Sequence, residues 1–525
     1  MSLAVWMQRR ADFAPDKVAI RFDGADLSYA DLAVKAARLA VLLGNGLGVG
    51  RGDRVAWLGF NSPEMIALLF ACARLGAILI PLNWRLAAPE HQHMLEDCTP
   101  AALFVEAELL AQTATIADCV PRMRKIAVGA PAAGWLPYDE MLAAADPAAA
   151  PAPVGGDGDP VLICYTSGAT GRPKGAMLDQ ASVFWNAVNS THMHDMTSAD
   201  RVLTTLPMFH VGGLNIQTMP ALHAGATVVL HRKFDVDAAF DAIERERITL
   251  TVLVPTQLKA MLESPRWATA DLSSLRMIST GSTLVPHALI NAVQARGIPL
   301  IQVYGSTETS PIAAFLPAAE AFRKVGSTGK SAVHCDIRIV DDNGADLPPG
   351  TPGEILVRGG NVMCGYWNAP EATAAALVDG WFHTGDIGHF DAEGFLYVDD
   401  RKKDMIISGG ENIYPAELEG LLADWAAVHE VAVVGRPDDR WGEVAVACIV
   451  PKPGNRLTVD EVIDFFRGRL ARFKHPRDVV FMPQLPRNAM GKLQKGELRQ
   501  LVRDQPDRGR MNVAQEQPRV GARSE

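Results

Sequence analysis

The sequence has no long uninterrupted apolar segment and no two cysteines at the spacing of a metal-binding pair. Its most apolar stretch, residues 65–82, is divided by Arg74 and Gly76 into a helical pattern and a short strand pattern, so we interpret it as core rather than as a membrane span. The first ten residues lack the apolar run of a secretory signal. The seven cysteines are odd in number and scattered, which disfavours a structural zinc site and predicts a reducing, cytoplasmic environment.

An excess of positive charge is also missing, because the chain of 525 residues carries a formal net charge of −10. Such a chain offers no field that attracts nucleic acid or an anionic membrane, although a local basic pocket can still bind small phosphates. The hydrophobic fraction of 48% is that of a globular protein. Because the chain exceeds the size at which one core keeps growing, we expect a large lobe of subdomains and a smaller domain.

Short β-branched runs alternate with helical patterns through about the first 400 residues, which predicts α/β layers built on largely parallel sheets. From residue 336 the pattern changes to strand pairs joined by turns, which predicts a small antiparallel, barrel-like region. After residue 401 an α+β pattern begins. The predicted strands are residues 161–165, 202–206, 226–230, 250–254, 300–304, 336–340, 354–358, 431–435 and 444–450, and an amphipathic helix is predicted at residues 459–472.

The densest local signal is a loop rich in hydroxyl and glycine residues directly after an apolar strand, Tyr165-Thr166-Ser167-Gly168-Ala169-Thr170-Gly171-Arg172-Pro173-Lys174-Gly175. Glycines let backbone N–H groups approach phosphate oxygens, hydroxyls add donors and lysine adds a positive charge, so phosphate binding is the simplest function. It is not a Walker A loop, because Arg172 and Pro173 separate Gly171 from Lys174. The plain alternative is a flexible linker of small residues.

Six further motifs follow in order: Leu206-Pro207-Met208-Phe209-His210, Tyr304-Gly305-Ser306-Thr307-Glu308-Thr309, Trp381-Phe382-His383-Thr384-Gly385-Asp386, Arg401-Lys402-Lys403-Asp404, Ser408-Gly409-Gly410-Glu411-Asn412 and Pro486-Arg487-Asn488-Ala489-Met490-Gly491-Lys492. With the loop, they resemble the signatures of the adenylate-forming superfamily, which contains acyl-CoA synthetases, firefly-type luciferases and peptide-synthetase adenylation domains. The resemblance extends along nearly the whole chain. It implies an AMP-forming acyl-CoA synthetase that uses ATP, Mg²⁺ and coenzyme A to convert a carboxylic acid into an acyl-adenylate and then into a thioester.

The resemblance also implies the roles of individual residues in the nucleotide site. Tyr304 resembles the residue that packs on adenine, Thr307 the one that contacts the α-phosphate, and Glu308 the one that holds magnesium. Asp386, in a Gly-Asp turn, would accept hydrogen bonds from the ribose hydroxyls, with Arg401 beside it. The full expected nucleotide set is Thr166, Ser167, Gly168, Thr170, Gly171, Lys174, Gly281, Ser282, Tyr304, Gly305, Thr307, Asp386 and Arg401.

Lys492 matches the family's catalytic lysine of the first step. In that role, a desolvated cation bridges the attacking carboxylate and the α-phosphate and stabilises the charge that builds there. The family's small domain swings about a hinge at the position of Lys403. The expected division is therefore a large domain, residues 1–402, a small mobile domain, residues 403–503, and a polar tail, residues 504–525. Residues expected at the thiol tunnel and coenzyme A are Gly409, Gly410, Trp441, Lys474 and, as a gate, His210.

The sequence restricts the class of carboxylic acid that the enzyme would use but does not identify the acid. Peptide-synthetase domains place an aspartate beside a phenylalanine to pair an amino group, whereas here Phe209 is followed by His210, which argues against an α-amino acid. The expected pocket segments, residues 211–219, 281–284 and 310–315, contain no arginine or lysine to pair a second carboxylate. We expect a medium- or long-chain fatty acid or an aromatic acid such as a hydroxycinnamate.

Several alternatives remain open from the sequence. The acceptor can be a separate carrier protein instead of free coenzyme A, and luciferase-type oxygenation is a remote alternative. A catalytically inactive nucleotide-binding relative is a different class, against which the joint presence of Lys174, Glu308, Asp386, Arg401 and Lys492 speaks. The expected partners are small molecules, namely the acid, ATP and coenzyme A. The oligomeric state stays open, a homodimer among the alternatives.

Overall fold

The computed structural model describes residues 2–166, 173–282, 285–401, 404–408, 411–438, 441–467, 469–470, 472–488 and 493–503. The chain forms two compact units, Met1–Val398 and Asp399–Glu525. Among the described residues, no helix combines the length and the apolar character needed to cross a membrane. All seven cysteines lie in the described ranges, and all are free thiols.

The first unit contains a nine-stranded sheet that is parallel from β1 to β14, with antiparallel strands at both edges. Its order is β16 (Lys330–Ser331), β15 (Ala314–Phe315), β14 (Leu300–Tyr304), β13 (Met277–Thr280), β12 (Leu250–Val252), β10 (Arg201–Thr204), β11 (Thr227–Leu230), β1 (Val18–Phe22) and β2 (Ala25–Ser28). The strands predicted between residues 202 and 304 are therefore confirmed, and each lies within two residues of its predicted ends.

A second large sheet of eight strands lies in the same unit and carries the hydroxyl- and glycine-rich loop. Its order is β19 (Gly365–Tyr366), β9 (Lys174–Asp179), β8 (Pro160–Thr166), β4 (Ile78–Leu82), β3 (Arg54–Leu58), β5 (Ala102–Glu106), β6 (Arg124–Val128) and β7 (Leu136–Pro137). Strands β3 to β8 pair in parallel, whereas β8, β9 and β19 pair antiparallel. The antiparallel edge places Tyr366 opposite Ala176, two residues after Lys174.

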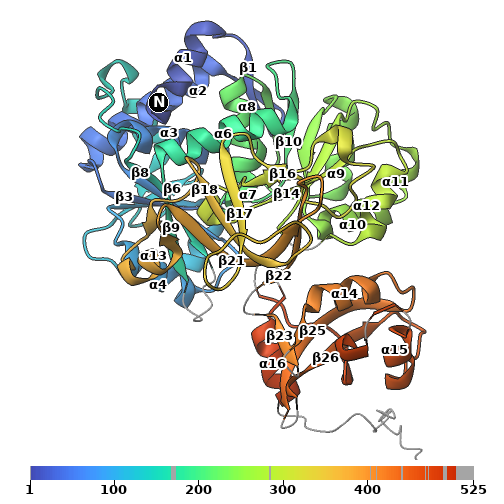
Figure 1. Ribbon diagram of the computed structural model, residues 1–525. Helices are drawn as coiled ribbons and strands as arrows, with labels where there is room; N and C mark the ends of the chain where they lie inside the picture. The colour runs from blue at the N-terminus through green and yellow to red at the C-terminus, as the bar shows by residue number, and fades with distance from the viewer. Residues whose placement is uncertain are drawn as a thin grey trace, which may run out of the picture. The chain divides into compact units, whose positions relative to one another are not determined.

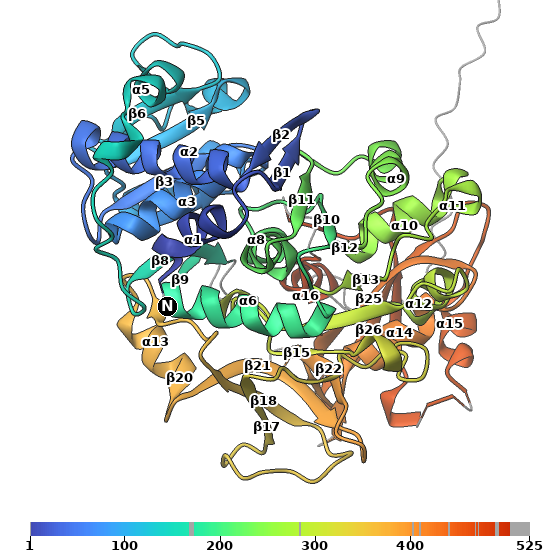
Figure 2. The same ribbon diagram turned by 90° about the horizontal axis from the view of Figure 1, so that it is seen from above.

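Alternation along the strands sends neighbouring side chains to opposite faces of the first sheet. Val202 and Met277 point into the main core, whereas Leu203 and Ile278 point into a second core. Three helices cover this second core: α9 (Val236–Arg245), α10 (Pro255–Glu263) and α12 (His287–Gln294). The second sheet also contributes to the main core, for example through Trp57, so this core lies between the two sheets. In Figures 1 and 2, α9 to α12 gather on one side of the unit, away from α1 to α3.

Helix α3 is buried along almost its whole length, because it lies within this shared core. It begins with the Ser62 side chain accepting a hydrogen bond from Met65 N and ends at Gly76, in the left-handed conformation. The helices of the unit are α1 (Trp6–Phe13), α2 (Tyr29–Val41), α3 (Pro63–Leu75), α4 (Ala88–Cys98), α5 (Tyr138–Ala144), α6 (Gln180–His194), α7 (Val211–Gly213), α8 (Met219–Ala224), α9 (Val236–Arg245), α10 (Pro255–Glu263), α11 (Arg266–Thr269), α12 (His287–Gln294) and α13 (Pro370–Ala376).

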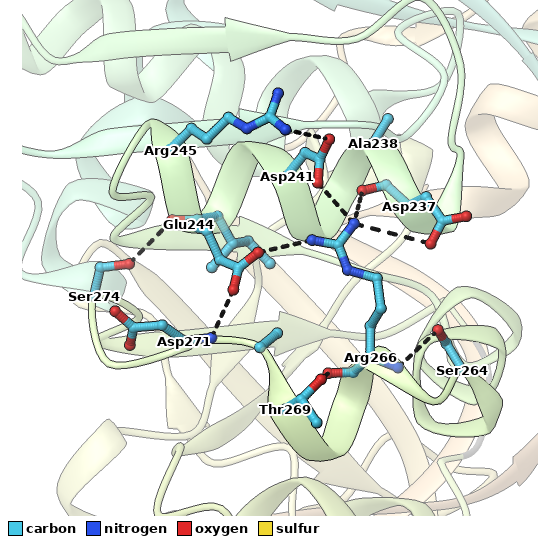
Figure 3. Close-up of polar contacts among 12 residues, drawn as sticks. Asp237, Ala238, Asp241, Glu244, Arg245, Ser264, Arg266, Thr269, Asp271 and Ser274 are labelled. Atoms are coloured by element: carbon cyan, nitrogen blue, oxygen red, sulfur yellow. Dashed lines mark hydrogen bonds and ion pairs between the residues drawn. The ribbon is translucent and has the colours of Figure 1, made fainter.

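A network of ion pairs fastens the short helix α11 to α9. The Arg266 guanidinium binds Asp241 and Glu244 at 2.7 Å each, and Glu244 also accepts a hydrogen bond from Asp271 N at 2.9 Å (Figure 3). A planar guanidinium shared by two carboxylates is held in one geometry, which suits a helix of only four residues. We assign this network a structural role.

A smaller antiparallel sheet completes the unit and confirms the predicted change of pattern after residue 336. It contains β17 (Cys335–Val340), β18 (Gly353–Gly359), β21 (Trp381–Phe390) and β20 (Leu377–Val378), with β22 (Leu396–Arg401) paired to β21 and leading into the second unit. The register between β18 and β21 shifts at Glu354 and Leu356. This irregularity coincides with Asp386, which the Gly-Asp motif predicts to lie in a turn.

The second unit is an α+β domain around one sheet. The sheet contains β24 (Glu411–Ile413), β23 (Ile406–Ser408), β26 (Gly442–Pro451), β25 (Val428–Asp438) and β27 (Asp478–Phe481), and the helices are α14 (Pro415–Ala423), α15 (Val459–Phe465) and α16 (Lys495–Arg503). The helix predicted at residues 459–472 is wrong in length, because α15 ends with Phe466 as its C-cap. A glycine, the poorest helix former after proline, stands two residues later in the sequence.

Candidate functional site

Strands β8 and β9 fix the two ends of the predicted phosphate loop. Thr166 and Lys174 face each other in this antiparallel pair, and Oγ1 of Thr166 donates to the carbonyl oxygen of Lys174 at 3.4 Å. Four predicted site residues of the loop, Ser167, Gly168, Thr170 and Gly171, lie outside the described residues. The structure therefore locates the base of the loop and its lysine.

Strand β14 ends at Tyr304 and leads into the turn that carries Thr307 and Glu308. Gly305 has a φ of 155°, and a Cβ there would lie 1.6 Å from the carbonyl oxygen of Pro311, so only glycine fits. Thr307 and Glu308 follow in a short 3₁₀ turn (Thr307–Thr309) and are half-buried. The tight backbone turn thus presents a hydroxyl and a carboxylate at the carboxyl end of a parallel strand, where α/β proteins usually bind ligands.

Tyr366 connects Glu308 with Lys174. Its hydroxyl donates to Oε1 of Glu308 at 2.9 Å, and the Lys174 ammonium lies 5.4 Å from the centre of its ring. The backbone N–H of Met363 donates to the Glu308 carbonyl oxygen at 2.7 Å. Burial, together with the Glu308 carboxylate nearby, raises the pKa of the Cys164 thiol to about 12. The Lys174 cation and the Glu308 anion thus lie in one site, the cation near the ring of Tyr366 and the anion at its hydroxyl.

Tyr304 and Asp386 form a second pair in the same unit. The Tyr304 hydroxyl donates to Oδ2 of Asp386 at 2.9 Å, and both residues are buried. Asp386 lies within strand β21 and not in a turn as the sequence suggested, because Gly385 has a φ of 67° at the register shift and bends the strand there. An ionised carboxylate has two oxygens and accepts up to four hydrogen bonds.

Gly281 and Ser282 follow β13, the strand next to β14. A Cβ at Gly281 would lie 2.7 Å from the Val303 carbonyl oxygen, so the glycine allows a close approach of the two backbones. Ser282 is exposed and has a φ of 75°, which is uncommon for a residue with a side chain. These two residues occupy the same edge of the sheet as Gly305, as their predicted role requires.

His210, the predicted gate, directly precedes the predicted acyl segment of residues 211–219; it is half-buried, and its ring centre lies 4.7 Å from that of Phe209. After α7 the chain forms a π-helical turn, Leu214–Thr218, a rare structure that is common at functional sites. Within it, Asn215 and Gln217 are buried. In the part of the chain that the structure describes, both side-chain amide atoms of Asn215 and Oε1 of Gln217 lack a hydrogen-bond partner.

His194 supports this segment from α6 and is fully buried. Its Nδ1 lies 2.9 Å from the Ser190 carbonyl oxygen, whereas Nε2 lies 2.8 Å from Oγ of Ser279 and 3.0 Å from Nε2 of Gln217. These contacts require a neutral ring that donates from Nδ1 and accepts at Nε2. Burial, opposed by the hydrogen bond to Ser190, lowers the pKa of His194 to about 4.

In the second unit, the predicted coenzyme A residues have local partners. The Lys474 ammonium lies 2.8 and 2.7 Å from the two carboxylate oxygens of Glu417, and the Arg477 guanidinium lies 5.1 Å from the ring centre of Trp441. Arg401 belongs to β22, but its side chain is not described. Four further predicted residues, Lys403, Gly409, Gly410 and Lys492, lie outside the described residues.

Sequence reasoning missed Tyr366 entirely. The only signal for it is a Gly-Tyr-Trp triplet, residues 365–367, which is too short to separate from an ordinary strand end. Its contact with Glu308 spans 58 positions and depends on the pairing of β19 with β9. The residues that the structure brings together are thus Lys174, Tyr366 and Glu308 in one cluster and Tyr304 and Asp386 in the other.

Two family models match the chain. The AMP-binding enzyme model matches residues 7–367, and the AMP-binding enzyme C-terminal domain model matches residues 417–492. Indoleacetate–CoA ligase of Aromatoleum aromaticum is 58% identical over 502 residues, covering 96% of this chain and 98% of that protein. Feruloyl-CoA synthase of an Amycolatopsis species is 44% identical, with 95% and 98% covered. Long-chain-fatty-acid–CoA ligase FadD13 of Mycobacterium tuberculosis is 38% identical, with 94% and 97% covered.

Solved structures agree with the fold along nearly the whole chain. ATP-bound MatB from Rhodopseudomonas palustris has a TM-score of 0.88 at 32% identity, covering 96% of this chain and 99% of that one. The o-succinylbenzoate CoA synthetase MenE from Bacillus subtilis, in complex with its acyl-adenylate intermediate, has a TM-score of 0.83 at 34% identity, with 94% and 97% covered. The α/β fold class with a large N-terminal and a smaller C-terminal domain is therefore confirmed.

Proposed function

Since the chain belongs to the AMP-binding enzyme family and is an AMP-forming acid–thiol ligase, we propose that it joins an aromatic monocarboxylic acid to coenzyme A. In the first step a carboxylate oxygen attacks the α-phosphorus of ATP, the bond to the bridging oxygen breaks, and pyrophosphate leaves. In the second step the thiol of coenzyme A loses its proton and its sulfur attacks the acyl carbon. The bond to the adenylate oxygen then breaks, and AMP leaves.

The observation that carries this proposal is the arrangement of charged groups around the end of β14. Lys174 and Glu308 both contact Tyr366. Tyr304, the last residue of β14, donates from its hydroxyl to Asp386. We assign Lys174 to the phosphates, Asp386 to the ribose hydroxyls and Tyr304 to the adenine side of the pocket. A nucleotide needs these three kinds of partner, namely a cation, a hydroxyl acceptor and an aromatic surface.

Glu308 fits the magnesium ion that accompanies ATP. Mg²⁺ prefers oxygen ligands and is usually held by one or two carboxylates together with substrate phosphates and water. Glu308 is half-buried, and among the described residues no group of three or more histidine, cysteine or acidic side chains forms a metal site. When bound, the ion would offset phosphate charge. Thr307, in the same turn, is proposed to donate a hydrogen bond to the α-phosphate.

Lys492 is proposed as the cation that bridges the attacking carboxylate and the α-phosphate, because two anions must approach each other there. We propose that the domain of residues 403–503 brings it to the site by rotation about Lys403. The same rotation would later present Gly409 and Gly410 to the thiol of coenzyme A, with His210 as a gate and with Trp441 and Lys474 at the coenzyme. These assignments rest on the sequence motifs.

An aromatic acid with a hydrogen-bonding group suits the buried polar atoms of the π-helical turn. Leaving a buried polar atom unpaired costs about 1–3 kcal/mol, and an alkyl chain cannot pair one. An indole N–H or a phenolic hydroxyl can pair with Asn215 or Gln217, which the structure leaves with unpaired amide atoms in its described part. The relatives at 58% and 44% identity are named for indoleacetate and ferulate. A long-chain fatty acid is the second candidate, in view of the relative at 38% identity.

The test is acid-dependent exchange of labelled pyrophosphate into ATP, followed by addition of coenzyme A. The panel contains indole-3-acetate, ferulate, hexadecanoate and 2-succinylbenzoate. We expect exchange and thioester formation with one of the aromatic monocarboxylates, and neither with the dicarboxylate. Exchange with hexadecanoate alone would favour the fatty-acid candidate. Exchange without a thioester would favour a carrier protein as acceptor, and production of ADP would refute the proposal.

Two variants separate the parts of the proposal. Lys492→Ala should lose exchange by orders of magnitude yet retain thioester formation from a supplied acyl-adenylate, and equal loss of both steps would contradict the two-position model. Asn215→Leu should raise the KM of the aromatic acid about tenfold, as expected when a buried polar partner is removed, without weakening ATP binding. An unchanged KM in Asn215→Leu would exclude Asn215 as a partner of the acid.

A further inference from the structure

A short segment after β18, residues 361–368, contacts both the turn that carries Glu308 and the strand that carries Lys174. The backbone N–H of Met363 donates to the Glu308 carbonyl oxygen at 2.7 Å, and the backbone N–H of Trp367 donates to the Gly175 carbonyl oxygen at 2.7 Å. Gly175 directly follows Lys174. The segment therefore connects the turn that carries Glu308 to the strand that carries Lys174.

Two side chains anchor the segment, one near each end. Nε1 of Trp367 donates to the Asp97 carbonyl oxygen at 3.1 Å, and Nδ2 of the fully buried Asn361 donates to the Thr309 carbonyl oxygen at 2.7 Å. Tyr366 lies between these anchors, in β19, opposite Ala176 of β9. Its ring is thus held at a defined place between Lys174 and Glu308.

The arrangement keeps two opposite charges apart. Lys174 faces the ring of Tyr366 at 5.4 Å, whereas Glu308 accepts from its hydroxyl at 2.9 Å, and these two described residues form no ion pair with each other. A direct Lys174–Glu308 pair would consume the cation and the carboxylate that the nucleotide and its metal need. A cation also interacts favourably with an aromatic face, so the ring stabilises Lys174 without neutralising it.

We propose that Tyr366 is a positioning residue for the adenylation step: its ring prevents Lys174 from pairing with Glu308, and its hydroxyl orients the Glu308 carboxylate. The proposal rests on the proposed function of Lys174 and Glu308. The phenol donates to one carboxylate oxygen, so the other oxygen would be the one that binds a metal ion. Tyr366 itself forms no bond in the reaction, and its two parts have separable effects.

Two variants test these two parts. Tyr366→Phe keeps the ring and removes the hydroxyl. The Mg²⁺ concentration that gives half the maximal exchange rate should rise about tenfold, as expected for the loss of a hydrogen bond to a charged group. Excess Mg²⁺ should restore the exchange rate. Tyr366→Leu also removes the ring, so Lys174 can reach Glu308. Its KM for ATP should therefore rise about tenfold or more, and excess Mg²⁺ should not restore it.

Ligand binding gives a readout that does not depend on turnover. ATP raises the unfolding midpoint of a protein that binds it, and titration of Mg²⁺ at fixed ATP reports the metal response without any acid. The matched control is Tyr29→Phe, which removes a buried phenol that donates to the Ala226 carbonyl oxygen at 2.7 Å outside the site. This control should lower the midpoint yet leave the Mg²⁺ response unchanged.

The outcomes are distinct. A wild-type Mg²⁺ response in Tyr366→Phe would overturn the inference, and so would an equal change in Tyr29→Phe, which would mark the effect as one of general stability. If wild-type protein shows no stabilisation by ATP with Mg²⁺, the proposed nucleotide site fails, and this inference fails with it. Tyr366→Phe decides the role of the hydroxyl even where Tyr366→Leu does not fold, and an unchanged KM for ATP in folded Tyr366→Leu would overturn the role of the ring.

Discussion

Asp386 offers a direct test of where the ribose binds. The Tyr304 hydroxyl donates to Oδ2 of Asp386 at 2.9 Å, and Asp386 is 6% exposed, so water competes weakly for this carboxylate. A hydrogen bond to a charged group contributes about 1.5–3 kcal/mol, which corresponds to about 10- to 150-fold in kcat/KM for each ribose hydroxyl. Removal of either hydroxyl from ATP should therefore cost wild-type enzyme that factor.

The assay is pyrophosphate exchange with ATP, 2′-deoxy-ATP and 3′-deoxy-ATP, for wild type and for Asp386→Ala. In the variant, ATP and both deoxy analogues should have nearly the same kcat/KM, because the partner of the missing hydroxyl is already gone. Tyr304→Phe keeps the carboxylate and should retain the penalty. Asp346→Ala is a surface control, since Asp346 pairs with Arg338 on the outside of the unit and its side chain is 69% exposed.

A deoxy penalty in Asp386→Ala as large as in wild type would refute the assignment of Asp386 to the ribose. Folding must be checked at the same time, because the Tyr304 hydroxyl loses a buried partner in this variant, at a cost of about 1–3 kcal/mol of stability. The comparison between nucleotides cancels that cost, since all three are measured on the same protein. The magnitude that matters is therefore the ratio between ATP and its analogues.

Two further predictions concern stability. Burial holds the pKa of His194 at about 4, below the 6.5 of an exposed histidine, so the unfolded chain binds a proton that the native ring does not. The free energy of unfolding should fall as pH decreases from about 7 to about 4.5, by at most about 3 kcal/mol for this residue. In His194→Gln it should depend less on pH, and equal slopes of unfolding free energy against pH in the two proteins would contradict this. In the second unit, Lys495 and Glu419 form an ion pair at 2.8 Å, and their side chains are only 15% and 16% exposed. Lys495→Met should lower the free energy of unfolding by about 3 kcal/mol, whereas the double variant with Glu419→Met should recover most of it, and denaturant titrations that show no recovery would argue against a charge effect.

The sequence by itself determined the strands, the order of the motifs and the family. Runs such as residues 300–304 are rich in β-branched and apolar residues, and the alternation of such runs with helical patterns sufficed for an α/β fold because both signals are local. Helix α15 shows the limit of this approach, since the apolar pattern continues to residue 472 while the helix ends with its cap at Phe466. Apolar spacing reports which face is buried and not where the backbone stops being helical.

Only the tertiary structure decided how the site is assembled. Tyr366, in an edge strand of one sheet, reaches Glu308 in the turn after β14 across 58 positions, and Tyr304 reaches Asp386 in a different sheet across 82. No local pattern encodes such contacts, because they depend on strand pairing and on how the sheets pack. The motifs named four of the five residues in the two clusters, but the tyrosine that separates the cation from the carboxylate became visible only when the edge strand β19 was placed beside β9.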